Sequence, residues 1–332
     1  MVTWGIDFRL SYQEIGTFVE SLPKRPVVCA VTATANPAMC REIIRSLRLR
    51  HPVRTSLPLR RENLVYEVDV VWTPKRRLYE ILQAEGDHKG LIYCGSRAKT
   101  EQTARMLQEA GIAAEAFHAG MSAERRKELQ NMLRAGHIRV LCATVAFGMG
   151  IDLSDLRFVV HLSLPHRISD YLQETGRVGR NGSDAHCYLL ITPQNALAAH
   201  RSQIAALRRN PDASGAARSA AQEVQLAEVQ AMLTTALQSR CFPRAMARSM
   251  GQWQRACGTC SACRSKDRWR GWEKPLKVAG CGETDVILWW LLRIRRKVAR
   301  EQLRHPLEIC DDEDLRLCAA RKTITAQEIK NP

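Results

Sequence analysis

The sequence predicts an α/β fold built on a parallel sheet. Strands and helices alternate regularly from residue 90 to residue 191, which is typical of a parallel sheet covered by helices on both faces. The chain has 332 residues, enough for two or three domains with cores of their own. Its content of 45% hydrophobic and 25% charged residues indicates a globular rather than a disordered protein.

The first expected element is a buried strand in residues 26–35, an apolar run rich in Val and Thr that ends at Thr32. Asn36 and Pro37 follow as a helix cap and first helical position. In the regular alternation, the expected strands are 91–94, 113–117, 138–143, 158–162 and 186–191, and the expected helices are 98–110, 123–134 and 168–175. After residue 192 the strands stop, and residues 194–208 and 221–239 are expected to be helical.

A phosphate-handling site is expected among the residues that follow these strands. Parallel sheets bind ligands at the carboxyl ends of their strands, and Ser96, Thr144 and Leu164 come just after strands. The segment Q173-E-T-G-R-V-G-R180 lies at the end of the last expected helix. Its glycines let the backbone approach a ligand closely, and its arginines can bind phosphate with two hydrogen bonds.

The charge of the chain favours a polyanionic partner, most simply nucleic acid. Lys and Arg number 50 against 34 Asp and Glu, which gives a net charge of +16 and a pI near 9.6. The alternative is a basic surface that only aids solubility. Met1–Gly5 does not resemble a secretory signal, and the most apolar run, Val286–Leu292, is too short to span a bilayer. We therefore expect no membrane association and a cytoplasmic location, such as a bacterial cytoplasm or nucleoid.

The twelve cysteines, in a reducing compartment, suggest metal binding rather than disulfides. Cys241 is followed by Cys257-x-x-Cys260-x-x-Cys263, and four thiolates are suited to one tetrahedral, structural Zn²⁺. An iron–sulfur cluster and unligated cysteines are the alternatives. Cys281 is a spare thiol that could compete as a ligand, and three further cysteines inside expected strands are expected to be packing residues: Cys29, Cys94 and Cys142.

A series of motifs points to one family. In chain order these are T32-A-T-A35, I92-Y-C-G-S96, H118-A-G120, A143-T-V-A-F-G-M-G-I-D152, F158-V-V-H161 and Q173-E-T-G-R-V-G-R180. Their order and spacing closely resemble the second half of a RecQ-type superfamily 2 DNA helicase, over residues 1 to about 265. The resemblance implies an ATP-dependent 3′–5′ helicase of DNA recombination and repair. It also implies a RecA-like lobe, the C-terminal domain of P-loop NTPase helicases, with a helical zinc-binding subdomain and a small helical tail behind it.

The resemblance also implies roles for single residues. Arg180 would be the arginine finger for ATP and Mg²⁺ held by the other lobe, and Arg177 and Gln173 would bind phosphate or connect the nucleotide to the DNA. Asp152, with Gly150 beside it, would contact the nucleotide. The DNA backbone would be contacted by Ser96, Arg97 and Thr144. Plain helix capping is the alternative for Asp152 and Thr144.

The first residues resemble the aromatic-rich loop of the family, which senses single-stranded DNA. Trp4, Phe8 and Arg9 match that loop, whereas Ile6 and Leu10 replace a histidine and a proline. Isoleucine forms no side-chain hydrogen bond, which puts DNA-triggered ATP hydrolysis in doubt. Thr32 and Thr34 match the family motif that couples nucleotide state to lobe movement, although ordinary packing at a strand end is the alternative.

The sequence contains no P-loop pattern G-x-x-x-x-G-K-[ST] and no DExH box. We therefore expect this chain by itself to hydrolyse no ATP. Because the DNA-contacting loops and the net charge of +16 are present, we still expect it to bind single-stranded and forked DNA. Three explanations stay open: a subunit that works with a separate chain carrying the first lobe, a truncated gene product, or a non-catalytic DNA-binding accessory protein.

The resemblance divides the chain into four expected regions. Residues 1–60 would be a remnant of the first helicase lobe, 61–193 the second RecA-like lobe and 194–270 the zinc-binding subdomain. Residues 283–332 resemble the start of an HRDC domain, a small helical DNA-binding module, and a generic pair of amphipathic helices is the alternative there.

Overall fold

The computed structural model describes residues 14–71, 73–144, 155–192, 215–238, 240–264, 309–310 and 312–321, with scattered positions within 194–199 and 284–302. The chain divides into two compact units, one of residues 1–61 with 243–256 and one of residues 62–242 with 257–332. Five residues expected in the functional site lie outside the described residues: Trp4, Phe8, Arg9, Gly150 and Asp152. The same holds for Cys281 and for most of the expected helix 194–208.

The second unit contains a six-stranded sheet in which every described pairing is parallel, with the order β1-β6-β5-β2-β4-β3. The strands are β1 Leu64–Val70, β2 Gly90–Tyr93, β3 Ala114–Phe117, β4 Val140–Ala143, β5 Phe158–His161 and β6 Ala185–Ile191. The α/β class and the RecA-like sheet expected from the sequence are confirmed.

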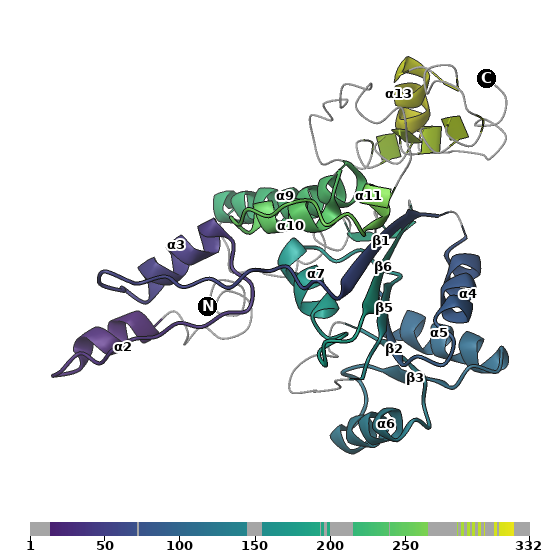
Figure 1. Ribbon diagram of the computed structural model, residues 1–332. Coiled ribbons are helices and arrows are strands. Elements are labelled where there is room, and N and C mark those ends of the chain that lie inside the picture. Colours follow the sequence, from purple (N-terminus) through teal and green to yellow (C-terminus); the bar gives the residue numbers. More distant parts are fainter. Residues whose placement is uncertain are drawn as a thin grey trace. The chain divides into compact units, whose positions relative to one another are not determined.

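Helices cover both faces of this sheet, because each parallel crossover returns over one face. Figure 1 shows α4 and α5 on one face and α7 on the other. The bounds are α4 Pro74–Ala84, α5 Arg97–Glu109, α6 Ala123–Ala135 and α7 Ile168–Thr175. The side chains of Ser96 and Ser122 cap α5 and α6, and Gly136 ends α6 in the left-handed conformation, with φ at 83°.

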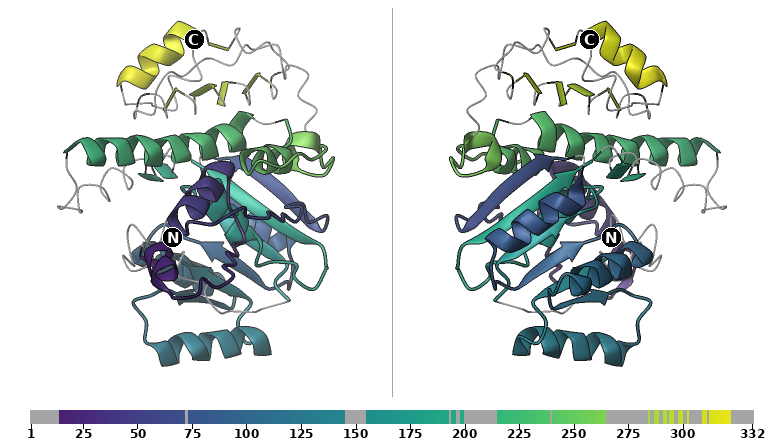
Figure 2. Two further views of the ribbon diagram at one scale, coloured as in Figure 1. Left: turned by 90° about the vertical axis from the view of Figure 1, so that its left-hand side faces the viewer. Right: turned by 90° about the vertical axis from the view of Figure 1, so that its right-hand side faces the viewer.

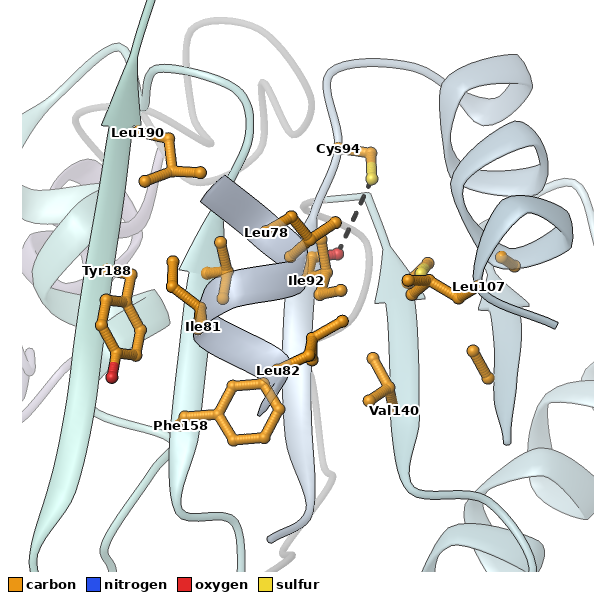
Figure 3. Packing of buried hydrophobic residues seen from close by; sticks show 14 of the residues in the cluster. Leu78, Ile81, Leu82, Ile92, Cys94, Leu107, Val140, Phe158, Tyr188 and Leu190 are labelled. Carbon is orange, nitrogen blue, oxygen red and sulfur yellow. Dashed lines mark hydrogen bonds between the residues drawn. The ribbon is translucent and has the colours of Figure 1, made fainter. Parts of the chain in front are cut away.

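The core on the α4 and α5 face is a close-packed apolar layer (Figure 3). Leu78, Ile81 and Leu82 of α4 pack there on side chains from the strands, among them Phe158. Gly90 is required beside that ring, since a Cβ at position 90 would lie 2.2 Å from Phe158 Cζ. On the opposite face, three aromatic rings pack with centroids 5.5–6.1 Å apart: Tyr66, Tyr171 and Phe242.

A buried carboxylate joins the end of α4 to β6. Glu85 accepts hydrogen bonds from the Tyr188 hydroxyl at 2.8 Å and from His186 Nδ1 at 2.7 Å, and His88 Nδ1 lies 3.2 Å away. Burial alone would raise the pKa of Glu85, but the bonds from His186 and Tyr188 outweigh it and lower that pKa. The carboxylate is thus held charged, as buried acids with several donors usually are.

The remaining described helices of this unit follow the sheet in sequence. They are α9 Gly215–Gln238, α11 Ser261–Arg264 and α13 Asp312–Arg321. Between α9 and α11, α10 Phe242–Ser249 has its first residue in this unit and the others in the first unit. Figure 2 shows the length of α9, and the Arg167–Glu228 ion pair joins it to the start of α7. None of the described helices is long and apolar enough to cross a lipid bilayer.

The outer edge of β1 is covered by α11. The Val68 amide donates to Ser261 Oγ at 2.9 Å, and Arg264 forms an ion pair with Glu67. An uncovered edge strand would offer unpaired amides to other chains, so α11 completes the sheet on this side.

The first unit contains the helices α2 Ile15–Ser21 and α3 Pro37–Ser46. Asn36 caps α3 as expected, accepting from the Met39 amide at 2.8 Å. The buried strand expected in residues 26–35 is wrong: these residues form no strand, and Val27 and Val31 are 99% and 91% exposed. The run has the composition of a strand, but no described strand lies beside it to accept its hydrogen bonds. Cys29, expected to be a packing residue, is likewise exposed.

Candidate functional site

The expected DNA-contacting residues gather at the carboxyl ends of three adjacent strands. Ser96 and Arg97 follow β2, His118 follows β3, and Thr144 follows β4. The sheet order places these strands next to one another, so residues far apart in the chain share one edge. Ser96 and Arg97 are exposed and Thr144 is half-buried, which leaves hydroxyl groups and a guanidinium for a phosphate backbone.

Arg97 is held over the H118-A-G120 turn. A Cβ at position 120 would lie 3.1 Å from Arg97 Nη1 and 3.2 Å from His118 Nδ1, so a glycine lets the guanidinium approach the backbone. His118 is buried, and its Nε2 lies 3.1 Å from Glu101 Oε1. The H118-A-G120 motif is part of the family resemblance, but the sequence indicates no role for it. The structure indicates that it supports Arg97.

The Gln173–Arg180 segment lies elsewhere on the sheet. α7 starts near the carboxyl end of β5 and carries the chain back, so that the Gly179 amide donates to the Leu156 carbonyl at 2.8 Å, ahead of β5. Ser96, Thr144 and Leu164 therefore follow strands, and the Gln173–Arg180 segment lies at the end of a helix, as the sequence indicates, but this segment ends away from the strand carboxyl ends. The eight-residue helix and the turn that must reach the start of β6 explain the difference.

The backbone around the two arginines is tightly constrained. Gly179 has φ at +61°, and a Cβ there would lie 2.7 Å from Asn63 Nδ2, so this position strongly favours glycine. Gln173 and Arg180 are exposed, whereas Arg177 is half-buried. Arg180 Nε donates to the Gly176 carbonyl at 3.4 Å. Arg180 thus presents its guanidinium at the surface, and Arg177 lies deeper in the lobe.

A buried polar network under this segment was not found from the sequence. His161 Nε2 lies 2.8 Å from Glu174 Oε2, and the imidazole stacks on Tyr93 with ring centroids 5.0 Å apart. Burial raises the pKa of the Tyr93 hydroxyl, with Glu174 adding to the effect and Arg177 opposing it. These residues link the ends of β2 and β5 to the arginine segment. The signal in the sequence was a histidine ending an apolar strand and an acid inside the motif, but their pairing requires the fold.

Asp170, in the first turn of α7, supplies a test of the electrostatics here. Burial raises the pKa of Asp170 from 3.8 to about 6, with Arg167 opposing and Glu174 adding to the shift. Because the folded pKa exceeds the unfolded one, the wild type loses stability as pH rises from about 4 to about 6 and no more above that. The difference between the two pKa values sets an upper limit of about 3 kcal/mol on this loss. Asp170→Asn should therefore raise the free energy of unfolding at pH 7 by about 1–2 kcal/mol after allowance for partial exposure.

Urea unfolding of wild type and Asp170→Asn at pH 4, 5, 6 and 7 measures this effect. The difference should be near zero at pH 4 and should grow to its full size by pH 7. Asp87→Asn, at an exposed acid, is the matched control and should show no such growth. A gain of equal size at every pH would contradict the assignment to Asp170 ionisation.

The four clustered cysteines meet as the sequence expected. The Sγ atoms of Cys241, Cys257, Cys260 and Cys263 all lie within 4.8 Å of one another. The Cys257 amide donates to Cys241 Sγ and the Cys260 amide to Cys257 Sγ, both at 3.3 Å, and such bonds stabilise thiolates. Burial alone would raise the pKa of Cys257, but the amides of Cys260 and Thr259 lower it to about 7. A soft, four-sulfur, partly ionised set is suited to Zn²⁺.

Comparisons with known proteins agree with these features. The family described as "Helicase conserved C-terminal domain" matches residues 73–182. The ATP-dependent helicase SGS1 of Saccharomyces cerevisiae is 42% identical over 188 residues, which are 55% of this chain and 13% of that protein. The ATP-dependent DNA helicase RecQ of Pasteurella multocida is 33% identical over 261 residues, 78% of this chain and 40% of that protein.

Among solved structures, the Escherichia coli DEAD-box protein SrmB, bound to RraA, aligns with 40% of this chain and 79% of that chain at 25% identity and a TM-score of 0.37. The chain spans less than half the length of the SGS1 and RecQ relatives.

Proposed function

Since this chain carries the C-terminal helicase domain of the RecQ family, we propose that it is the DNA-engaging half of an ATP-dependent 3′–5′ DNA helicase of recombination and repair. In this proposal it binds single-stranded and forked DNA through Ser96, Arg97 and Thr144. Arg180, with Arg177 and Gln173 behind it, acts on ATP and Mg²⁺ held by a separate ATP-binding lobe.

The juxtaposition at the end of the sheet is the observation that supports this proposal. Three adjacent strands are followed by Ser96, His118 and Thr144, and Arg97 lies close to Gly120. Loops at strand ends present hydroxyls and amides to phosphates without reading bases. Such an arrangement is suited to a motor that must move along any sequence.

The exposed segment 26–32 supports the idea of a separate ATP-binding lobe. Its Val-rich composition is typical of a strand buried on both faces in a parallel sheet, yet Val27 and Val31 are almost fully exposed. α3 follows it and has no buried residue. A strand followed by a helix makes one βα unit, so we propose that a second α/β lobe, on another polypeptide or in a longer chain, pairs with this segment and makes it a strand.

DNA binding by the isolated chain tests the proposal. We expect weak, sequence-independent binding of single-stranded DNA, because one lobe makes about three or four phosphate contacts, each contributing roughly −0.7 to the slope of log K against log salt. The slope should be about −2 to −3. Arg97→Ala combined with Thr144→Ala should weaken binding and reduce the slope by about 0.7, for the one lost charge.

The control for this measurement is Arg105→Ala, at an exposed arginine farther along α5, which should leave slope and affinity close to wild type. The zinc content of all variants should be equal. If the double substitution changes neither affinity nor slope, binding arises from diffuse basic surface, and the proposed role of these loops is wrong.

A further inference from the structure

Trp253, in the first unit, is 81% exposed. Tryptophan side chains are on average well buried in folded proteins, so an indole this exposed calls for a physical explanation. The residue follows α10, after a turn in which Gly251 adopts φ at +75°. None of the roles derived above for the helicase lobe or the cysteine cluster involves it.

The backbone that carries Trp253 is firmly held. The neighbouring Gln252 accepts from the Leu59 amide at 2.9 Å and donates to the Leu57 carbonyl at 2.9 Å and to Ser56 Oγ at 2.7 Å. The backbone N–H of Gln252 donates to the Ala247 carbonyl at 2.8 Å. A Cβ at Gly251 would approach Pro37 Cγ to 2.7 Å. The indole therefore stands in solvent on a fixed turn and not on a loose loop.

Only basic charge surrounds this turn in the chain. Residues 243–256, which carry Trp253, and residues 49–61, which bond to Gln252, contain no Asp or Glu. Together these two segments contain seven arginines: Arg50, Arg54, Arg60, Arg61, Arg244, Arg248 and Arg255. Arg54, Arg248 and Arg255 are exposed. Such a surface repels cations and basic proteins and attracts phosphodiesters.

We propose that Trp253 with Arg54, Arg248 and Arg255, named here the Trp253 platform, is a binding site for single-stranded nucleic acid. An unpaired base stacks on the indole while the arginines contact the flanking phosphates. Stacking accepts any base, because every base has a π-face, and a fixed aromatic loses little conformational freedom on binding. An apolar protein partner fits less well, since the chain segments next to the indole carry exposed arginines and no acidic residue. This inference rests on the proposed DNA binding and adds a second contact site to it.

Titration of the full chain with a fluorescent dT20 oligonucleotide tests the platform. Trp253→Ala should weaken binding about 5- to 150-fold, the range of one lost base–aromatic stack. The salt slope should not change, because stacking releases no counterions. Trp253→Phe should restore most of the affinity. Arg248→Ala with Arg255→Ala should instead reduce the slope by about 1.4.

Phe18→Ala is the matched control, since Phe18 is a 63% exposed aromatic of the same unit, and it should bind dT20 as the wild type does. A dT20·dA20 duplex should show little loss with Trp253→Ala, because its bases are already stacked. Wild-type affinity of Trp253→Ala for dT20, or an equal loss in Phe18→Ala, would overturn the platform. Absence of any dT20 binding by the wild type would instead contradict the proposed function itself.

Discussion

We propose that Cys241, Cys257, Cys260 and Cys263 bind one Zn²⁺, and removal of this ion is expected to unfold the chain around the cluster. Structural zinc contributes apparent binding free energies of about 10–16 kcal/mol in small zinc domains. This is as large as the free energy of unfolding of a whole domain, about 5–15 kcal/mol. Cys260 directly precedes α11, and Cys263 lies within it. This helix has four residues and is too short to be stable alone. Without the metal, the described contacts that hold this helix include the Val68–Ser261 hydrogen bond and the Arg264–Glu67 ion pair, which together contribute far less.

The edge of the sheet should report the loss. The Val68 amide of β1 is hydrogen-bonded to Ser261 of α11 at 2.9 Å, so its hydrogen exchange should speed up when a chelator is added. Amides in the central strand β5 should stay protected. Elemental analysis of the untreated protein should find one zinc per chain. Iron in its place would show that the cluster holds a different metal.

Single substitutions make this test sharper. Cys260→Ser should lower the zinc content and expose the Val68 amide without any chelator, since Cys260 is fully buried among the four sulfurs. Cys40→Ser, at a half-buried cysteine of the other unit, should change neither. Full retention of zinc and of Val68 protection in Cys260→Ser would contradict the proposed ligand set.

Periodicity in the sequence was enough to predict most of the sheet. The expected strands at 91–94, 113–117, 158–162 and 186–191 match β2, β3, β5 and β6 to within one residue, and the helix expected at 168–175 matches α7. These segments form local patterns bounded by caps and glycines, so short-range chemistry specifies them. β1 and α4 were missed, although Leu64, Tyr66 and Val68 alternate with more polar neighbours as in a strand with one buried face.

The features that could not be predicted from the sequence depend on contacts between segments far apart in the chain. Residues 26–35 have the composition of a buried strand, but a strand forms only where another strand accepts its hydrogen bonds, and none is described there. The pairing of His161 with Glu174, like the position of Arg97 over Gly120, joins segments that meet only through the crossovers of the sheet. The cysteine cluster was predicted correctly because metal ligation is encoded in spacing along the chain.

Substitution of Arg180 is expected to have the largest effect on turnover. To measure it, this chain can replace the 261 matched residues in the Pasteurella multocida relative, which gives a chimera with an ATP-binding portion. If Arg180 stabilises the charge that develops on the transferred phosphoryl group, Arg180→Ala should lower kcat for DNA-stimulated ATP hydrolysis by about 10³–10⁵-fold. KM for ATP and binding of single-stranded DNA should change much less.

The geometry explains why Arg180, rather than Arg177, should carry this effect. The Arg180 side chain is exposed, and its Nε donates to the Gly176 carbonyl of the same segment. Arg177 is half-buried near Tyr93. Arg177→Ala should therefore also reduce the stability of the lobe, whereas Arg180→Ala should unfold at the same urea concentration as the parent.

Two further variants separate charge from geometry in the chimera. Arg180→Lys keeps the positive charge but loses the planar, two-pronged donor, so its kcat should fall between those of the parent and Arg180→Ala. Arg134→Ala, at an exposed arginine of α6, should hydrolyse ATP at the parental rate. Parental turnover by Arg180→Ala would show that Arg180 does not reach the nucleotide. The phosphate contact would then have to be assigned to Arg177 or Gln173, whose substitution should in that case abolish activity.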